Sequence, residues 1–233
     1  MIQHQVVRSN LRKGIHHLLR VQIYQFLDSA VISNADYSKT CDQVGGSCGQ
    51  HIRHVDDHFR CLVTNLNLKK VSPAHSQSTH STHSTHSTEN KTTVHCHIGS
   101  SMNSSNSSSS SSSSSSTHRY DVFRNRESDV ETSLSAAKTS ILSLDHTIQT
   151  LLTEQPKVKE TDILSTSVKV TFLTGGQETM FDSNIARELN FCLHHAYHHC
   201  ASIKIIAQNN GFDKAIPDMF GIAPSTVRYN EVE

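Results

Sequence analysis

One stretch of this chain cannot contribute to a packed core, and it limits what the rest can fold into. From residue 72 to residue 117 the sequence is dominated by Ser, Thr, His and Asn, with Ser-Thr-His repeats and an uninterrupted serine tract at Ser107–Ser116. Such a composition buries too little apolar surface to offset the entropy lost on ordering. Because loop closure costs only slightly more as a loop lengthens, a long insert is tolerated within one domain. We predict a single domain made of 1–71 and 118–233, with a disordered Ser/Thr/His-rich insert at 72–117.

Charge, apolar runs and cysteines argue against several classes of protein. The chain carries 21 Lys and Arg against 21 Asp and Glu, and no basic face stands out, which argues against nucleic-acid binding. No apolar run approaches the roughly 18 residues of a membrane span, and the polar N-terminus lacks a signal-peptide core. The 6 cysteines show no CxxC spacing, which favours free thiols over a disulfide framework. We expect a soluble cytoplasmic protein without nucleic-acid or membrane partners.

Apolar periodicity predicts an all-α fold, a four-helix bundle. The four helices are expected at about 10–30, 48–66, 128–152 and 184–209. The second follows a turn and N-cap within Val44–Ser47, and Asp182 or Ser183 is expected to cap the last, which stops at Gly211.

A small β-hairpin is predicted before the last helix, where 168–173 and 178–181 flank Gly175-Gly176. Two strands alone are marginally stable, so they must lie on the helices. The tail around Pro217 and Pro224 is expected to wrap the domain as an ordered segment without helix.

Two histidines on the last predicted helix carry the chemistry. His195 and His199 stand four residues apart and project from nearly the same side. Two neutral imidazoles held in this way can bind one transition metal if other elements supply further ligands. His194 and His198 form a second pair at the same spacing, so local geometry does not choose between the pairs. The chain is also rich in histidine, and composition alone would generate some such pairs.

Further candidate ligands lie upstream on the second predicted helix. His51, His54 and His58 can each approach the last helix, and Asp57 can hold the second nitrogen of an imidazole. Cys192 and Cys200 flank the last-helix pair in sequence but point away from it, so both are expected to be packing residues.

Four sequence blocks in order resemble the DinB/YfiT-like metalloenzyme superfamily. The first, Ser-x-Gly-x-His-x-Arg-His-x-x-Asp-His-Phe, spans 47–59, and the second, Tyr-Asp-x-x-x-Arg, begins at Tyr120 with one extra residue. The third is Arg-Glu-Leu-Asn-Phe at 187–191, leading into 195–199, and the fourth is Phe-Gly-Ile-Ala-Pro-Ser-Thr at 220–226. Together they cover nearly the whole predicted folded part.

The resemblance implies a four-helix bundle that binds a divalent metal, zinc, nickel or iron, through three histidines. The HxxxH pair of the family maps onto His195 and His199, and its second-helix histidine maps best onto His54, with His58 and His198 as alternates. Three imidazoles leave coordination positions open, as a catalytic site requires.

Relatives in the superfamily include thiol S-transferases, a maleylpyruvate isomerase and a domain of sulfoxide synthases. They imply activation of a thiol or water for transfer to, or hydrolysis of, a small electrophile, with no catalytic side chain assigned. Tyr120, Arg124 and Arg126 are weak candidates for substrate binding. The two arginines can equally pair with Glu127 or Glu131 at the surface. Arg187 and Glu188 are expected to serve the start of the last helix.

Two other functions stay open from the sequence. One is a non-catalytic binding or stress-related protein that keeps a structural or vestigial metal. The other is weak metal buffering by the many histidines of the insert. The expected partner is a small-molecule substrate, and a homodimer is an open alternative.

Overall fold

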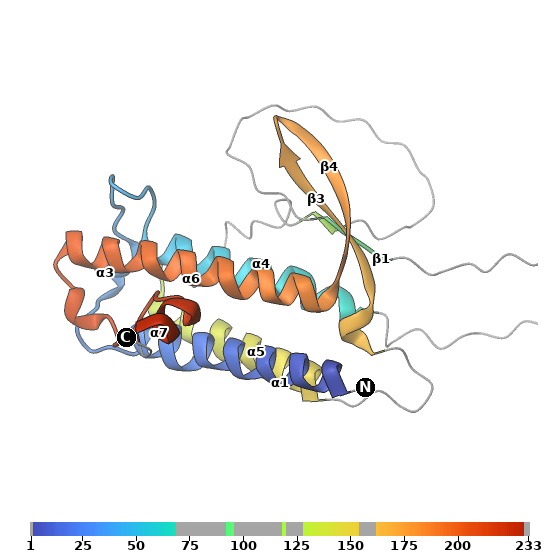
Figure 1. Ribbon diagram of the computed structural model, residues 1–233. Helices are drawn as coiled ribbons and strands as arrows, with labels where there is room; N and C mark the ends of the chain where they lie inside the picture. Colours follow the sequence, from blue (N-terminus) through green and yellow to red (C-terminus); the bar gives the residue numbers. More distant parts are fainter. Residues whose placement is uncertain (1, 69–91, 96–117, 120–127, 154–161, 231–233) are drawn as a thin grey trace, which may run out of the picture.

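The computed structural model is mostly helical and carries a small β-sheet beside the helices (Figure 1). It describes residues 2–68, 92–95, 118–119, 128–153 and 162–230. Among these residues, no helix combines the length and the apolar character that a bilayer crossing requires.

The first helical segment starts earlier than predicted. It comprises α1 (Ile2–His16), a π-helical stretch (His17–Ile23) and α2 (Tyr24–Leu27), whereas apolar periodicity placed its start near residue 10. The added turns are fixed by a polar anchor, because the buried side chain of Arg8 binds Asp162 and the carbonyl of Leu152.

The second long helix, α4 (Cys48–Leu68), begins where the sequence predicted, after the short α3 (Asn34–Ser38). Ser47 and Gln50 form a reciprocal cap, in which the Ser47 hydroxyl accepts from the Gln50 amide at 3.2 Å and the Gln50 side chain accepts from the Ser47 amide at 3.1 Å. Gly49 lies so close to another segment that a Cβ there would stand 1.9 Å from the Glu131 carbonyl oxygen. The Ser-x-Gly of the first block therefore has a structural role.

The third predicted helix is divided in the structure. A 3-10 turn, η2 (Asp129–Glu131), precedes α5 (Leu134–Thr153). The single helix expected at 128–152 was wrong at its start, because the hydroxyl of Ser133 accepts from the Ala136 amide and begins a new helix there.

The predicted hairpin is confirmed as β3 (Ser167–Thr174) and β4 (Gln177–Asn184), which follow the 3-10 turn η3 (Ile163–Ser165). Gly175 and Gly176 form its turn with φ of 60° and 83°, the left-handed values that a two-residue hairpin turn requires. Val168 and Val170 are buried, so one face of the hairpin joins the core.

Two short strands extend this sheet. β1 (Thr92–His95) pairs in parallel with β3, and β2 (His118–Arg119) pairs in parallel with β1. β1 falls within the predicted insert, whose other residues lie outside the described part of the chain. The division into domain and insert stays a prediction.

The last long helix, α6 (Ile185–Asn210), ends at Gly211 as predicted, with a φ of 82°. The predicted cap was wrong. Asn184 holds that position and accepts from the Arg187 amide at 2.9 Å, because β4 continues through Asp182 and Ser183 in extended pairing with β3.

The tail contains more helix than expected. After the 3-10 turn η4 (Asp213–Ala215), the tail ends in α7 (Pro224–Asn230), where a proline suits the first helical position. Between them Phe220 is fully buried, 5.6 Å from the ring of Phe26. Gly221 has a φ of 71° and lies against α6, where an added Cβ would stand 2.6 Å from the Ala201 backbone nitrogen. The Phe-Gly block therefore docks the tail on the helices.

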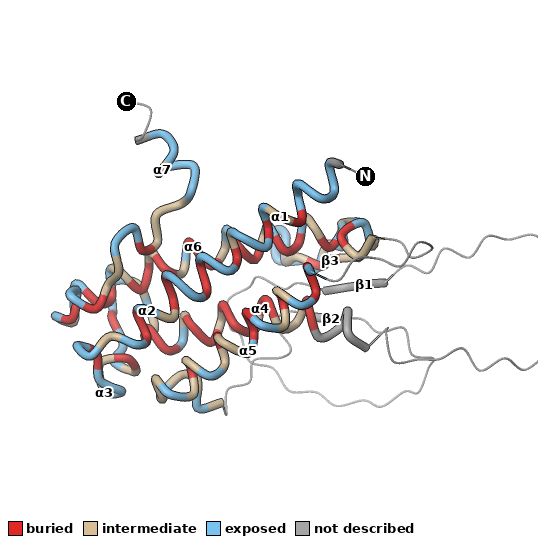
Figure 2. Tube along the Cα trace, turned by 90° about the horizontal axis from the view of Figure 1, so that it is seen from below, coloured by how far each residue is buried: buried red, intermediate tan, exposed pale blue. Residues whose placement is uncertain are grey.

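The long helical segments pack around one apolar core. α4 contacts both α5 and α6, and α1 contacts the same two helices. Figure 2 shows the buried positions turned inward along these segments. Most important for the site, α4 and α6 run side by side (Figure 1).

Candidate metal centre

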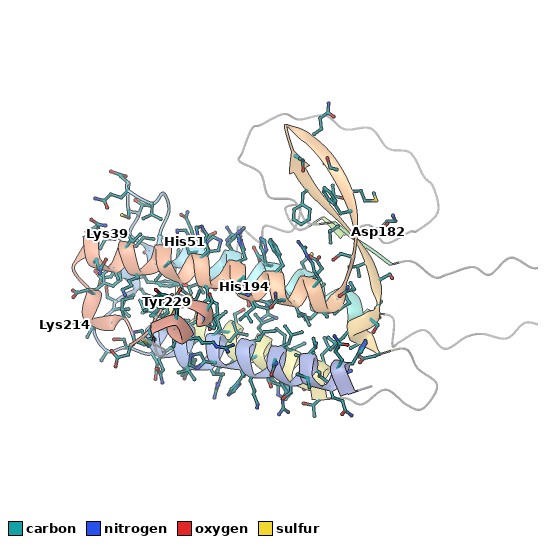
Figure 3. The ribbon with its side chains drawn as sticks, viewed as in Figure 1. Lys39, His51, Asp182, His194, Lys214 and Tyr229 are labelled. Carbon is teal, nitrogen blue, oxygen red and sulfur yellow. The ribbon has the colours of Figure 1, made fainter. Side chains whose placement is uncertain are left out.

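Five imidazoles meet where α4 and α6 run side by side. His51, His54 and His58 come from α4, and His195 and His199 come from α6. Each α4 ring lies 4.6 to 5.2 Å from at least one α6 ring, measured between centroids. His51 is among the side chains labelled in Figure 3. Two segments far apart in the sequence thus bring five histidine side chains together in one cluster.

The Nε2 atoms of His54 and His199 both lie close to Nε2 of His195. Nε2 of His195 lies 3.1 Å from Nε2 of His54 and 3.0 Å from Nε2 of His199. Each ring nitrogen of an imidazole carries either one proton or one lone pair in the plane of the ring. Nε2 of His195 can therefore form a good hydrogen bond with only one of these two neighbours. A cation between the rings could accept the lone pairs of all three nitrogens. Imidazoles around tetrahedral zinc have nitrogens about 3.3 Å apart, close to the distances seen here.

A second grouping shares two of these residues. His54, His58 and His195 place ligand atoms within 4.8 Å of one another and can hold a metal ion. His58 is only 2% exposed, and its ring stacks on His195 at 4.6 Å. His54 and His195 therefore belong to both sets, and His199 and His58 compete for the third place. That His199 is the third ligand stays a prediction.

Burial distinguishes the two HxxxH pairs, which have the same spacing in the sequence. His195 and His199 are partly buried and face α4, whereas His194 and His198 are exposed. Figure 3 labels His194 on α6. The ring of His198, an alternate ligand, lies 5.4 Å from that of His199.

Burial keeps four imidazoles of the cluster neutral, those of His51, His58, His195 and His199. Desolvation, with a smaller contribution from the neighbouring His198, lowers the pKa of His195 from its ordinary value to about 4. Burial also holds the pKa of His58 and of His199 well below the usual range, with repulsion from the other rings as a lesser cause. The pKa of His51 is lowered for the same main reason. Neutral imidazole is the form that binds metals, so the cluster is ready for a cation at neutral pH.

Asp57 has another partner than the one expected. Its carboxylate accepts from Nη1 of Arg53 at 2.5 Å, and Arg53 also binds Glu131. Burial raises the pKa of Asp57 to about 6, against the attraction of Arg53. This ion pair fixes α4 to the η2 turn, so Asp57 supports the helix that presents the histidines.

The remaining predicted residues fall into two groups. Tyr120, Arg124 and Arg126 lie outside the described residues, so their role as substrate-binding groups stays a prediction. Cys192 and Cys200 are buried free thiols, as expected of packing residues. Cys41 and Cys48 are also buried free thiols.

The start of α6 adds an aromatic wall that sequence reasoning missed. Phe191 stacks on His195, with centroids 5.6 Å apart and planes 11° apart. The guanidinium of Arg187 lies 5.3 Å from the centre of the Phe191 ring and donates to Glu188, which is fully buried. Phe191 precedes His195 by four residues, and this helical spacing is the signal that could have identified it.

Comparisons with known proteins do not assign a family. No family model matches the chain, and no solved structure matches it. The chain is 34% identical over 106 residues to FK506-binding protein 5 of Rhizopus delemar, a match that covers 46% of this chain and 26% of that protein. The chain thus spans about a quarter of that relative's length, too little to place it in that relative's family.

Proposed function

We propose that this chain is a metal-binding protein of the DinB/YfiT-like type, in which imidazoles from α4 and α6 hold one divalent ion. The observation that carries the proposal is the convergence of Nε2 atoms on His195, at 3.0 and 3.1 Å. Zinc, nickel or iron suits a set of neutral imidazoles better than magnesium or calcium does, because those two prefer oxygen ligands. On this proposal the long helical segments form the four-helix bundle of that superfamily.

His54, His195 and His199 are the proposed ligands. His54 and His199 each direct Nε2 at the same nitrogen of His195, as ligands around one centre do. Three protein ligands leave room for a thiol or water, whose pKa a bound divalent ion lowers. The proposed activity is metal-dependent transfer to, or hydrolysis of, a small electrophile.

The surrounding residues are suited to orienting such a site. Packing of Phe191 on His195 restricts rotation of that ring, and the Arg53 contacts with Glu131 and Asp57 hold α4 in register. Rigid support of this kind is what precise ligand geometry requires. The buried cysteines have raised pKa values, because desolvation disfavours the thiolate, so Cys192 and Cys200 are unsuited to act as nucleophiles.

The burial of His58 favours a second candidate function. His58 lies in one group with His54 and His195, and its ring centroid is 4.3 Å from that of His54. If all four histidines bound the ion, no position would stay open for substrate, and the metal would be structural in a non-catalytic protein.

A ligand scan tests the proposal and separates the candidates. The chelator-treated full chain, without a purification tag, is titrated with Zn²⁺ against a competing chelator, beside alanine variants at His54, His58, His195 and His199. We expect one tight site that is lost in H54A, H195A and H199A and retained in H58A. His194→Ala is the matched control, because His194 neighbours His195 but is exposed. It should bind as the unchanged protein does.

The other outcomes of the scan are equally decisive. Loss in H58A together with the other three would favour the closed, structural site. Loss in H58A with retention in H199A would assign the third ligand to His58. Weak binding at several sites, abolished by replacing His80, His83 and His86, would identify metal buffering and refute the proposal.

A further inference from the structure

We propose that His51 is the residue that positions His199 for metal binding, by accepting a hydrogen bond from its Nδ1. This inference rests on the proposed function, because it assigns a role toward the same site. His51 is thereby a positioning residue and not a ligand.

The geometry of His199 carries the argument. Its Nδ1 lies 2.7 Å from Nδ1 of His51, and its Nε2 lies 3.0 Å from Nε2 of His195. The two nitrogens of one ring thus face two different histidines. A separation of 2.7 Å is that of a short hydrogen bond, and it is well below the spacing of about 3.3 Å between imidazole nitrogens that share one tetrahedral ion.

The position of one proton then decides what His199 offers to a metal. A neutral imidazole carries one N–H and one lone pair. When Nδ1 of His199 donates to His51, its Nε2 is a lone pair directed toward His195. If the proton between the two rings belonged to His51 instead, the other nitrogen of neutral His199 would be protonated and would repel a cation.

The surroundings of His51 are consistent with this assignment. His51 sits one helical turn before His54, so the element that supplies a ligand also supplies the acceptor. Its Nε2 is buried without a hydrogen-bond partner within 3.5 Å among the described residues, whereas its Nδ1 lies 2.7 Å from Nδ1 of His199. His51 therefore reaches His199 through Nδ1.

Partners of this kind typically contribute 10- to 100-fold to metal affinity, because they fix the tautomer and orientation of the ligand. The test compares His51→Leu, which removes the acceptor and keeps an apolar side chain in the space, with His51→Gln, whose amide oxygen can accept. Zn²⁺ affinity and stoichiometry are measured on the full chain. We expect H51L to weaken Zn²⁺ binding by about 10- to 100-fold with one ion still bound, and H51Q to retain most of the affinity.

Two results would overturn this role. Unchanged affinity in H51L would show that the contact does not matter, and loss of the whole site, as in H199A, would make His51 a ligand. Imidazole ¹⁵N chemical shifts of the metal-free protein give an independent readout: we expect His199 to carry its proton on Nδ1, and a proton on Nε2 would contradict us. If the unchanged protein bound no Zn²⁺, the proposed function would fail, while the tautomer would still decide the direction of the hydrogen bond.

Discussion

The metal-free protein should lose stability as pH falls below about 6.5, and His195→Ala should remove part of that loss. In the folded protein the pKa of His195 is lowered to about 4, mainly by desolvation, from an ordinary value of 6.5. Above pH 6.5 the ring is neutral in both the folded and the unfolded chain, so it does not affect the free energy of unfolding. Below that pH the unfolded chain takes up a proton that the folded chain does not.

The size of the effect follows from proton linkage. The penalty appears below pH 6.5 and grows until the folded pKa near 4 is reached. At pH 5 this shift would lower the free energy of unfolding by about 2 kcal/mol. Solvent screening of the partly exposed ring reduces the expected loss to about 1–2 kcal/mol. His58 and His199, whose pKa values are also lowered, act in the same direction.

Urea unfolding at pH 7.5 and pH 5.0, with chelator present, measures this difference. The unchanged protein should lose more stability between the two pH values than H195A does, by about 1–2 kcal/mol. His194→Ala, the exposed neighbour, should behave as the unchanged protein. An equal pH-dependent loss in H195A and the unchanged protein would refute the placement of His195 in a desolvated cluster.

Three further outcomes test the fold and the site. Gly221→Ala should destabilise the fold by more than about 2 kcal/mol, because the new Cβ would lie 2.6 Å from the Ala201 nitrogen. Gly211→Ala, whose Cβ would meet no atom within 4 Å, should cost only about 1 kcal/mol of left-handed backbone strain. Equal losses of stability for the two variants in chemical denaturation would count against the docked tail. Gly49→Ala should lower the melting temperature and weaken Zn²⁺ binding together, since the Cβ would stand 1.9 Å from the Glu131 carbonyl oxygen and displace η2 from α4, and normal stability would contradict this packing. Free Zn²⁺ at about 100 times its Kd should stabilise the unchanged protein by about 2.7 kcal/mol and leave H195A unaffected, as followed by thermal unfolding.

Helix positions were predictable to the extent that burial follows an apolar period. The starts of α4 and α6 and the two-glycine hairpin were close to expectation, because caps, periodicity and turn glycines agree there. The early start of α1 could not be predicted from periodicity, since it depends on the distant partners of Arg8. The cap at Asn184 was missed because neighbouring polar residues offer equivalent side-chain oxygens, and pairing between strands decides among them.

The candidate site was predictable in its elements but not in its ligand set. Helical spacing placed His195 and His199 on one face, yet His194 and His198 have the same spacing, and only burial against α4 distinguishes the pairs. The contact between His51 and His199 joins residues 148 positions apart, so it follows from the packing of two helices rather than from any local pattern.

The most direct test of the metal centre is elemental analysis of the full chain, purified without a histidine tag and beside H195A. We expect about one zinc, nickel or iron ion per unchanged chain and none bound tightly by the variant. Absence of metal from the unchanged protein, together with a melting temperature that none of the three ions raises, would contradict the central claim.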